Sequence, residues 1–338
     1  MSLGGLKKPW KTIYVATWLF ALALVTWTLL QLPLAEMAAR IGRLTASDYL
    51  LWAAINCLVL YLLIKRWQVL ADSLDAPLTP GFLFRLRQSG STINFVTPGP
   101  HLGGEPLQIY WLHRYCSLSM HRAVAVLGLD RFMETGTNTA VLLAGVLILL
   151  GSSVAPIADW LEISALLAAV LVLLSIGSAM ILRHPDWLAA RFRRLAQSWM
   201  TSGRLERSER GWVALVELLR NAFKTRRQQL WLALLLSIAG WGALLLELFV
   251  LLSYLEIAPS VFQLITIMVG MRLAMLLPVP GGIGTIEASV LWSFNLLGLP
   301  LTAAAGLIAL MRLRDAIMLL IGLACLASFQ QPLKQAQQ

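Results

Sequence analysis

Charged side chains recur inside strongly apolar stretches of this sequence, and their types suit the recognition of an anionic headgroup. A charge near the centre of a bilayer costs at least about 2.5–3.5 kcal/mol on insertion scales, so such residues are functional candidates. Arginine suits phosphate because its planar donor fork meets two oxygens at once and stays charged. Carboxylates can pair with those arginines or hold a cationic group. The candidates are Glu105, Arg131, Glu134, Arg272, Glu287, Arg312 and Asp315, with Arg314, Asp130 and Glu247 in similar surroundings.

The candidates fall into two sets with the same internal spacing. In each set a proline–glycine turn is followed seven residues later by a glutamate, and further on an arginine stands three residues before an acid. The turns and glutamates match at an offset of 182, whereas Arg131 maps onto Arg312 at 181. An internal duplication with one inserted residue explains both offsets. The residues assigned to the two turns are Asn94, Pro98, Gly103, Gly104, Pro280, Gly281, Gly282 and Gly284.

Purely structural roles account for part of this pattern. Each arginine and the acid three residues after it can form an ion pair that only stabilises a helix. The glycines can permit close approach of helices. A functional interpretation is that the helices following Gly103, Gly104 and Gly284 present free backbone N–H groups to an anion. The structural roles leave unexplained why the whole pattern recurs in both halves.

Composition places the chain in a membrane. Of its 338 residues, 58% are apolar and 13% are charged, against about 25% charged in soluble domains, and the mean hydropathy is +0.74. The net charge of +10 stands beside apolar runs, as the positive-inside rule predicts, and does not indicate nucleic acid. The three cysteines and four histidines lack the spacing of disulfides or metal ligands. No catalytic motif is present, so we expect neither an enzyme nor a metal or cofactor.

Six apolar runs are long enough to cross a bilayer. We interpret Lys65 and Arg66 as the cytoplasmic end of the second run, and we expect both termini in the cytoplasm of a bacterial inner membrane. The predicted spans are 13–32, 49–64, 123–150, 163–182, 230–254 and 299–327.

Each proline–glycine turn joins two shorter arms. The arms 82–96 and 104–116 would be about 23 Å and 20 Å long as helices, short of the roughly 30 Å apolar core. We therefore predict a re-entrant hairpin there and a second one formed by 262–277 and 286–297. Irregular backbone at membrane depth is tolerated only where protein buries it or a polar cavity hydrates it, so the turns indicate a cavity.

Three predicted spans separate the two hairpins, and this odd number places them on opposite sides of the membrane. The predicted fold class is an all-α polytopic membrane protein with about six transmembrane helices plus two oppositely oriented re-entrant helical hairpins in an inverted repeat. Many alternating-access transporters are organised in this way. The whole chain, 1–338, would form one integral membrane domain, with 82–150 and 260–328 as the two repeat units.

The segment 183–228 is basic and amphipathic. It holds 11 Lys or Arg against four Asp or Glu, so its net charge is 11 − 4 = +7, which predicts a cytoplasmic location. Two helical stripes of apolar residues begin at Leu188 and Trp212. The basic side could recruit anionic lipid. An interfacial connector that only obeys topology is the alternative.

Several of these fragments also carry a family resemblance. They are Asn94, Pro98 and Gly103-Gly104-Glu105 in the first half, and Leu277-Pro278, Pro280 to Glu287 and Arg312 in the second. Through them the chain resembles, over essentially its whole length, the flippase-like, lysylphosphatidylglycerol-synthase transmembrane-region family. The resemblance extends to the membrane half of the bacterial multiple peptide resistance factor, which implies movement of aminoacylated phosphatidylglycerol between leaflets. No segment resembles that factor's aminoacyl transferase domain, so translocation is implied and lipid synthesis is not.

The resulting hypothesis is a lipid translocase whose partners are membrane lipids with an anionic headgroup. Arg131 and Arg312 would hold the phosphate, with Arg272 assisting. Glu105 and Glu287 would pair with those arginines in the empty state or hold a cationic group such as an aminoacyl amine. A second hypothesis is a non-transporting scaffold that binds a lipid- or glycan-modifying enzyme through 183–228. A third is an intramembrane transferase acting on a lipid-linked sugar. The sequence is also compatible with a homodimer.

Overall fold

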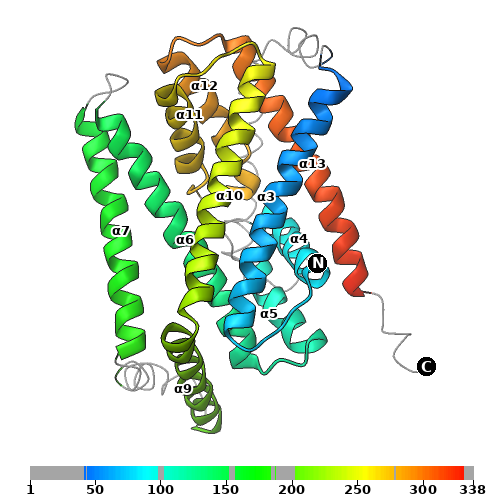
Figure 1. Ribbon diagram of the computed structural model, residues 1–338, viewed down its shortest axis with the longest axis vertical. Helices are drawn as coiled ribbons and strands as arrows, with labels where there is room; N and C mark the ends of the chain where they lie inside the picture. Colours follow the sequence, from blue (N-terminus) through cyan, green and yellow to red (C-terminus); the bar gives the residue numbers. More distant parts are fainter. Residues whose placement is uncertain are drawn as a thin grey trace, which may run out of the picture.

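The computed structural model describes residues 42, 44–97, 103–151, 157–183, 187, 202–277 and 279–330, and every regular element in these ranges is a helix (Figure 1). The predicted first span, 13–32, the first turn with Pro98, and the stripe beginning at Leu188 lie outside the described residues. The elements are α3 (Ala46–Ser73), α4 (Pro80–Val96), α5 (Gly104–Tyr115), α6 (Met120–Leu150), α7 (Ile157–Arg183), α9 (Ser202–Thr225), α10 (Arg227–Tyr254), α11 (Val261–Ala274), η2 (Pro280–Gly282), α12 (Thr285–Leu296) and α13 (Leu301–Gln330).

Four of these helices are long and apolar enough to cross a membrane, namely α3, α6, residues Trp160–Ile181 of α7, and α10. A 28-residue helix such as α3 is about 42 Å long, more than the roughly 30 Å apolar core. The protein is therefore a multi-pass, all-helical membrane protein in the part of the chain that the structure describes. α13 is 30 residues long and carries three charged residues, Arg312, Arg314 and Asp315, near its middle.

α3 is longer than the predicted span 49–64 that it contains. The helix continues through Lys65 and Arg66 to Ser73. Arg66 is not a solvated charge at the end of a helix, because its side chain is only 3% exposed and pairs with Asp130 on α6. A charge that marks the end of a span by its type can lie inside the protein when a tertiary partner compensates it.

The connections from α3 to α4 and from α10 to α11 have the same backbone. Asp75 and Glu256, which match at the offset of 181, both adopt a left-handed conformation, with φ values of 52° and 62°. In both turns the next residue donates its N–H to the carbonyl five residues earlier, over 3.0 Å. Thr79 and Ser260, which match at the same offset, then cap the following helix through their hydroxyl groups. The spacing seen in the sequence thus extends upstream of the predicted repeat units.

The helices of the two halves run in opposite directions. α3 packs along α10, and the two are antiparallel; α6 and α13 are antiparallel as well (Figure 1). Within each half the short helices pair, α4 with α5 and α11 with α12. The halves also interlock, because α4 packs on α13 and α11 packs on α6.

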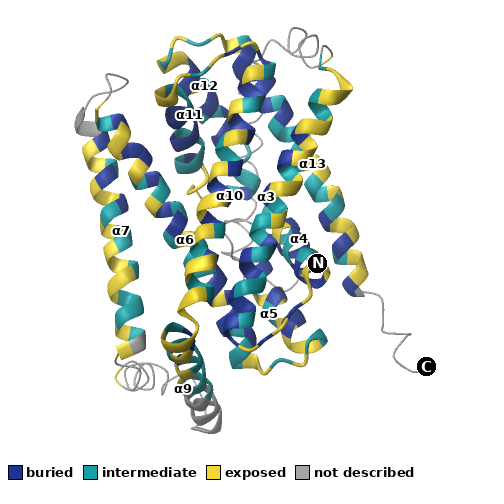
Figure 2. Cartoon of the chain, viewed as in Figure 1, coloured by how far each residue is buried: buried dark blue, intermediate teal, exposed yellow. Residues whose placement is uncertain are grey.

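Two clusters of buried apolar side chains lie at opposite ends of the long helices (Figure 2). One surrounds α11 and α12 and contains Ile267 and Phe294, whereas the other surrounds α4 and α5 and contains Leu86 and Leu112. Along α6 the apolar cluster around α11 and α12 begins at Val141, and the apolar cluster around α4 and α5 ends at Met133. The charged residues of the long helices stand near the transition between the clusters.

α9 packs against α6, α7 and α10. Its apolar stripe, which includes Leu215, Leu219 and Phe223, contacts the apolar cluster around α5. The stripe is therefore covered by protein, while Lys224 on the same helix is exposed.

Candidate functional site

The second turn places Glu287 beside Arg312. Gly281, Gly282 and Gly284 all have positive φ values, of 60°, 60° and 86°, which residues with a side chain adopt only at a cost. This backbone starts α12 directly after the turn, so that Glu287 stands in its first helical turn and accepts a hydrogen bond of 2.7 Å from the Gly284 N–H.

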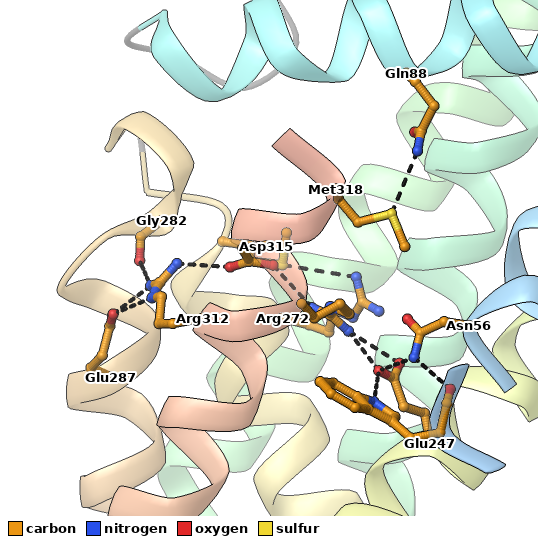
Figure 3. A network of polar contacts seen from close by, with 12 residues as sticks. Asn56, Gln88, Glu247, Arg272, Gly282, Glu287, Arg312, Asp315 and Met318 are labelled. Carbon is orange, nitrogen blue, oxygen red and sulfur yellow. Dashed lines mark hydrogen bonds and ion pairs between the residues drawn. The ribbon is translucent and has the colours of Figure 1, made fainter. Parts of the chain in front are cut away.

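Arg312 on α13 connects this hairpin to the long helix that follows it (Figure 3). Its Nε and Nη2 atoms both lie 2.5 Å from Glu287 Oε1, and Nη2 also reaches the Gly282 carbonyl at 3.4 Å. Nη1 pairs with Asp315 Oδ2 at 2.9 Å, the i, i+3 contact that the sequence predicted. Glu287 is buried, and Arg312 is 27% exposed, so the pair lies at the edge of the interior.

A second arginine on α13, Arg314, pairs with Glu247 of α10. Arg314 Nη1 lies 3.1 Å from both carboxylate oxygens of Glu247. The same carboxylate accepts hydrogen bonds of 3.1 Å from Trp52 Nε1 and Asn56 Nδ2 on α3. Glu247 is therefore a buried anion with a full set of donors, which is the condition for a charge to persist in an apolar interior.

The first half has the same kind of cluster. Arg131 Nη1 pairs with Glu134 Oε2 at 2.5 Å, and its Nε lies 3.5 Å from Glu105 Oε1 on α5. Glu134 also forms ion pairs with two further arginines. Its Oε1 lies 3.4 Å from Arg87 Nη2 on α4, and its Oε2 lies 3.5 Å from Arg66 Nη2 on α3. One carboxylate thus joins arginines from three helices of the same half.

The sequence analysis missed the pair formed by Arg66 and Asp130. Arg66 Nε and Nη2 donate to Asp130 Oδ1 at 3.0 and 2.7 Å, and both side chains are almost fully buried. A signal was present, because Arg66 and Glu247 match at 181, the offset of the duplication. The two positions carry opposite charges, so matching residue types did not reveal them.

The N–H groups of Gly103, Gly104 and Gly284, where α5 and α12 begin, already have side-chain acceptors. Asn94 Oδ1 accepts hydrogen bonds from the Gly103 and Gly104 N–H groups, at 3.2 and 2.6 Å. The Gly284 N–H is taken by Glu287. A side chain within hydrogen-bond reach satisfies such donors, so an anion has no vacant N–H group at these positions.

The turn of the second hairpin contacts the C-terminal end of α4 in the first hairpin. η2 packs against α4, and a Cβ atom placed on Gly281 would lie 2.6 Å from the ring of Phe95. The crossing of α4 and α13 is equally close, since a Cβ on Gly322 would overlap Thr92. Glycine is required at both contacts because any side chain would separate the helices.

Arg272 differs from the arginines that form the ion pairs described above. Its guanidinium lies over the indole ring of Trp241, 4.6 Å from the ring centroid, and Nη1 reaches Met275 Sδ at 3.8 Å. No carboxylate of the described residues lies within ion-pair distance of it. The structure therefore brings six of the predicted charged residues into ion pairs and leaves Arg272 outside them.

The charged residues described above form one cluster in each half, and each cluster has no net charge if Arg272 is counted with the second half. Three arginines face three acids in the first half, and the same holds in the second, so the sums are 3 − 3 = 0. The first cluster holds Arg66, Arg87, Arg131, Glu105, Asp130 and Glu134; the second holds Arg272, Arg312, Arg314, Glu247, Glu287 and Asp315. Among the described residues no three His, Cys, Asp or Glu side chains come together as a metal site.

Helices of spanning length around two balanced clusters of arginines and carboxylates define a polytopic membrane protein with a polar interior. Comparison with known proteins gives its family. The family described as "Lysylphosphatidylglycerol synthase TM region" matches residues 14–322, and the chain belongs to it.

A UPF0104 membrane protein of Methanothermobacter thermautotrophicus is 32% identical over 88 residues. The matched segment is 26% of this chain and 26% of that protein, so the match spans about a quarter of the relative's length. No solved structure matches the chain.

Proposed function

We propose that this protein is a lipid translocase, which moves an anionic or aminoacylated phospholipid between the leaflets of the inner membrane. Membership of a lipid-related membrane family supports a role at lipids. The observation that carries the proposal is a matched pair of contacts: Glu105 with Arg131, and Glu287 with Arg312, each joining a hairpin to a long helix.

The membrane placement that goes with this proposal has six spans, namely residues 13–32 and the helices α3, α6, α7, α10 and α13. The pairs α4–α5 and α11–α12 would enter from opposite sides as re-entrant hairpins, and both chain termini would be cytoplasmic. Support comes from the antiparallel course of the two halves, the matching turns and caps at an offset of 181, and the contact between the second turn and α4. These features are typical of inverted-repeat transporters with a site at the repeat interface.

In this mechanism the arginines bind the phosphate of the headgroup while the acyl chains stay in lipid. The carboxylates Glu105 and Glu287 neutralise the arginines when no lipid is bound. A phosphate that enters one half competes with the carboxylate there, which loosens that hairpin from its long helix. Because the second turn touches α4, movement of one hairpin changes the contact with the other, and the site opens to the two sides in turn.

Leaflet exchange of fluorescent and aminoacylated phospholipids in liposomes that contain the purified protein tests the proposal. We expect fast exchange by the wild-type protein and none by a folded Glu105→Gln/Glu287→Gln variant. Arg85→Gln serves as the matched control, because Arg85 lies on α4 over the ring of Phe329 and outside both clusters. Wild-type protein that exchanges no lipid would instead favour the scaffold hypothesis, in which substitutions on the basic side of α9 matter more than the buried glutamates.

A further inference from the structure

Resting on the proposed function, we infer that Arg272 is the residue that first receives the phosphate group of the lipid, while Arg131 and Arg312 hold the hairpins in place until the phosphate competes with their carboxylate partners. From the sequence we expected Arg131 and Arg312 to hold the phosphate and Arg272 to assist. The contacts of the described residues separate them.

Arg131 and Arg312 already have carboxylate partners on two sides. Arg131 contacts Glu134 and Glu105, and Arg312 contacts Glu287 and Asp315. A phosphate could reach either guanidinium only by displacing a carboxylate that is itself held in the protein. In their present contacts these two arginines therefore fix the hairpins to the long helices, and a phosphate has to compete with those contacts.

Arg272 has its hydrogen-bonding edge available. A guanidinium has five N–H donors, and the described partners of Arg272 are one ring face and one weak sulfur acceptor. Arg272 is half-buried and burial desolvates its guanidinium, so an anion that pairs with the donors other than Nη1 would compensate the lost hydration. An arginine that stacks through its flat face keeps its in-plane donors free, and two of those donors match two oxygens of a phosphate.

The protein holds Arg272 in this position through Trp241. The indole Nε1 donates a hydrogen bond of 3.0 Å to Asn138 Oδ1 on α6, and Trp241 itself is buried. The ring plane under Arg272 is therefore fixed by α6 and α10 together. A cation that is oriented before the ligand arrives loses little freedom on binding.

Charged residues of both clusters act on Arg272. Burial desolvates its guanidinium, Arg314 repels it, and Glu134 of the first cluster and Glu247 of the second attract it. Figure 3 shows Arg272 in the same polar network as Asp315 and Glu247. A phosphate bound here would lie within reach of charges from both halves, and it would relieve the repulsion between Arg272 and Arg314.

Binding of dihexanoyl phosphatidylglycerol to the full-length protein in detergent, measured by calorimetry at low salt, tests this inference. We expect Arg272→Gln to weaken binding about tenfold or more, as the loss of a charge-assisted hydrogen bond predicts. Arg272→Lys should weaken binding less, because it keeps the charge and loses the fork. Arg85→Gln, which removes another arginine stacked on an aromatic ring, should bind like the wild type.

Inorganic phosphate is the second probe. Competition by phosphate at Arg272 without binding of the lipid would assign the site to free phosphate, and tighter binding of the lipid would assign it to a headgroup. Wild-type affinity in Arg272→Gln, or an equal loss in Arg85→Gln, would overturn the inference. If Arg272→Gln does not fold, wild-type affinity in Arg272→Lys would overturn it in the same way.

The two proposals fail differently. If phosphatidylglycerol binds through Arg272 but the protein exchanges no lipid between leaflets, the binding site is supported and the translocase function is contradicted. Fast exchange by wild type and by a folded Arg272→Gln variant would leave the function standing and remove Arg272 from it.

Discussion

Arg66 on α3 and Glu247 on α10 occupy equivalent positions of the duplicated spacing, since 247 − 66 = 181, and they carry opposite charges. Each reaches the fourth helix of its own half: Arg66 pairs with Asp130 on α6, and Glu247 pairs with Arg314 on α13. Both contacts join the first and fourth helices of a half with reversed polarity, but the partners on the fourth helix differ in position, because Arg314 matches Met133 and not Asp130. The two halves therefore have similar packing and different electrostatics.

Removing one partner of the buried pair should be far more damaging than removing an exposed one. Arg66→Met leaves Asp130, whose side chain is fully buried, without its main partner, so we expect a loss of about 3–5 kcal/mol in the free energy of unfolding. The measurement is thermal or denaturant unfolding in detergent. The matched control is Arg226→Gln, which breaks the exposed pair with Asp75 and should cost no more than about 1 kcal/mol. Equal effects of the two variants would contradict the burial argument.

The contact between the second turn and α4 requires glycine at position 281. Gly281→Ala introduces a Cβ that overlaps Phe95 and a positive φ that costs roughly 1–2 kcal/mol, so we expect lower stability and slower lipid exchange. Adding Phe95→Ala should recover the part of the loss that comes from the overlap. Gly240→Ala, at a helical position with open space around it, should be neutral or stabilising by about 1 kcal/mol or less. A harmless Gly281→Ala would show that the second turn does not need to touch α4.

The matching turns after α3 and α10 should lie on opposite sides of the membrane. Pro77 and Ala258 match at the offset of 181 and are both exposed, which makes them suitable for labelling. In a chain with Cys57, Cys116 and Cys325 replaced, Pro77→Cys should react with an impermeant maleimide only from the cytoplasmic side, and Ala258→Cys only from the other side. Labelling of both from one side would contradict the inverted arrangement.

The amide of Asn94 should contribute to the stability of the first hairpin. Asn94→Ala removes the acceptor of the Gly103 and Gly104 N–H groups, and unpaired buried donors of this kind cost about 1–3 kcal/mol each. We expect earlier unfolding and faster amide exchange at the start of α5. Asn221→Ala on α9 is the control, because that amide contacts only Thr225 on the same exposed face. An unchanged rate of amide hydrogen exchange at the start of α5 in Asn94→Ala would show that the cap does not stabilise the hairpin.

The helices themselves were largely predictable from the sequence. The predicted arms 82–96 and 104–116 differ from α4 and α5 by at most two residues at each end. Helix periodicity, capping hydroxyls and proline–glycine turns are local properties, so they can be read without the fold. The i, i+3 pairs of Arg131 and Arg312 were predictable for the same reason, because helix geometry alone brings them together.

The sequence by itself therefore determined the membrane class, the helices, the duplicated spacing and most of the charged candidates. Only the tertiary structure decided which charges meet. The pair of Arg66 and Asp130 joins residues 64 positions apart, and the cap of Asn94 depends on how closely α4 approaches α5. Arg272 was identified by its type, yet its stacking on Trp241 without a carboxylate partner among the described residues follows from the packing of α11 against α6 and α10. Long-range contacts follow from how helices pack, and one sequence pattern is compatible with several pairings.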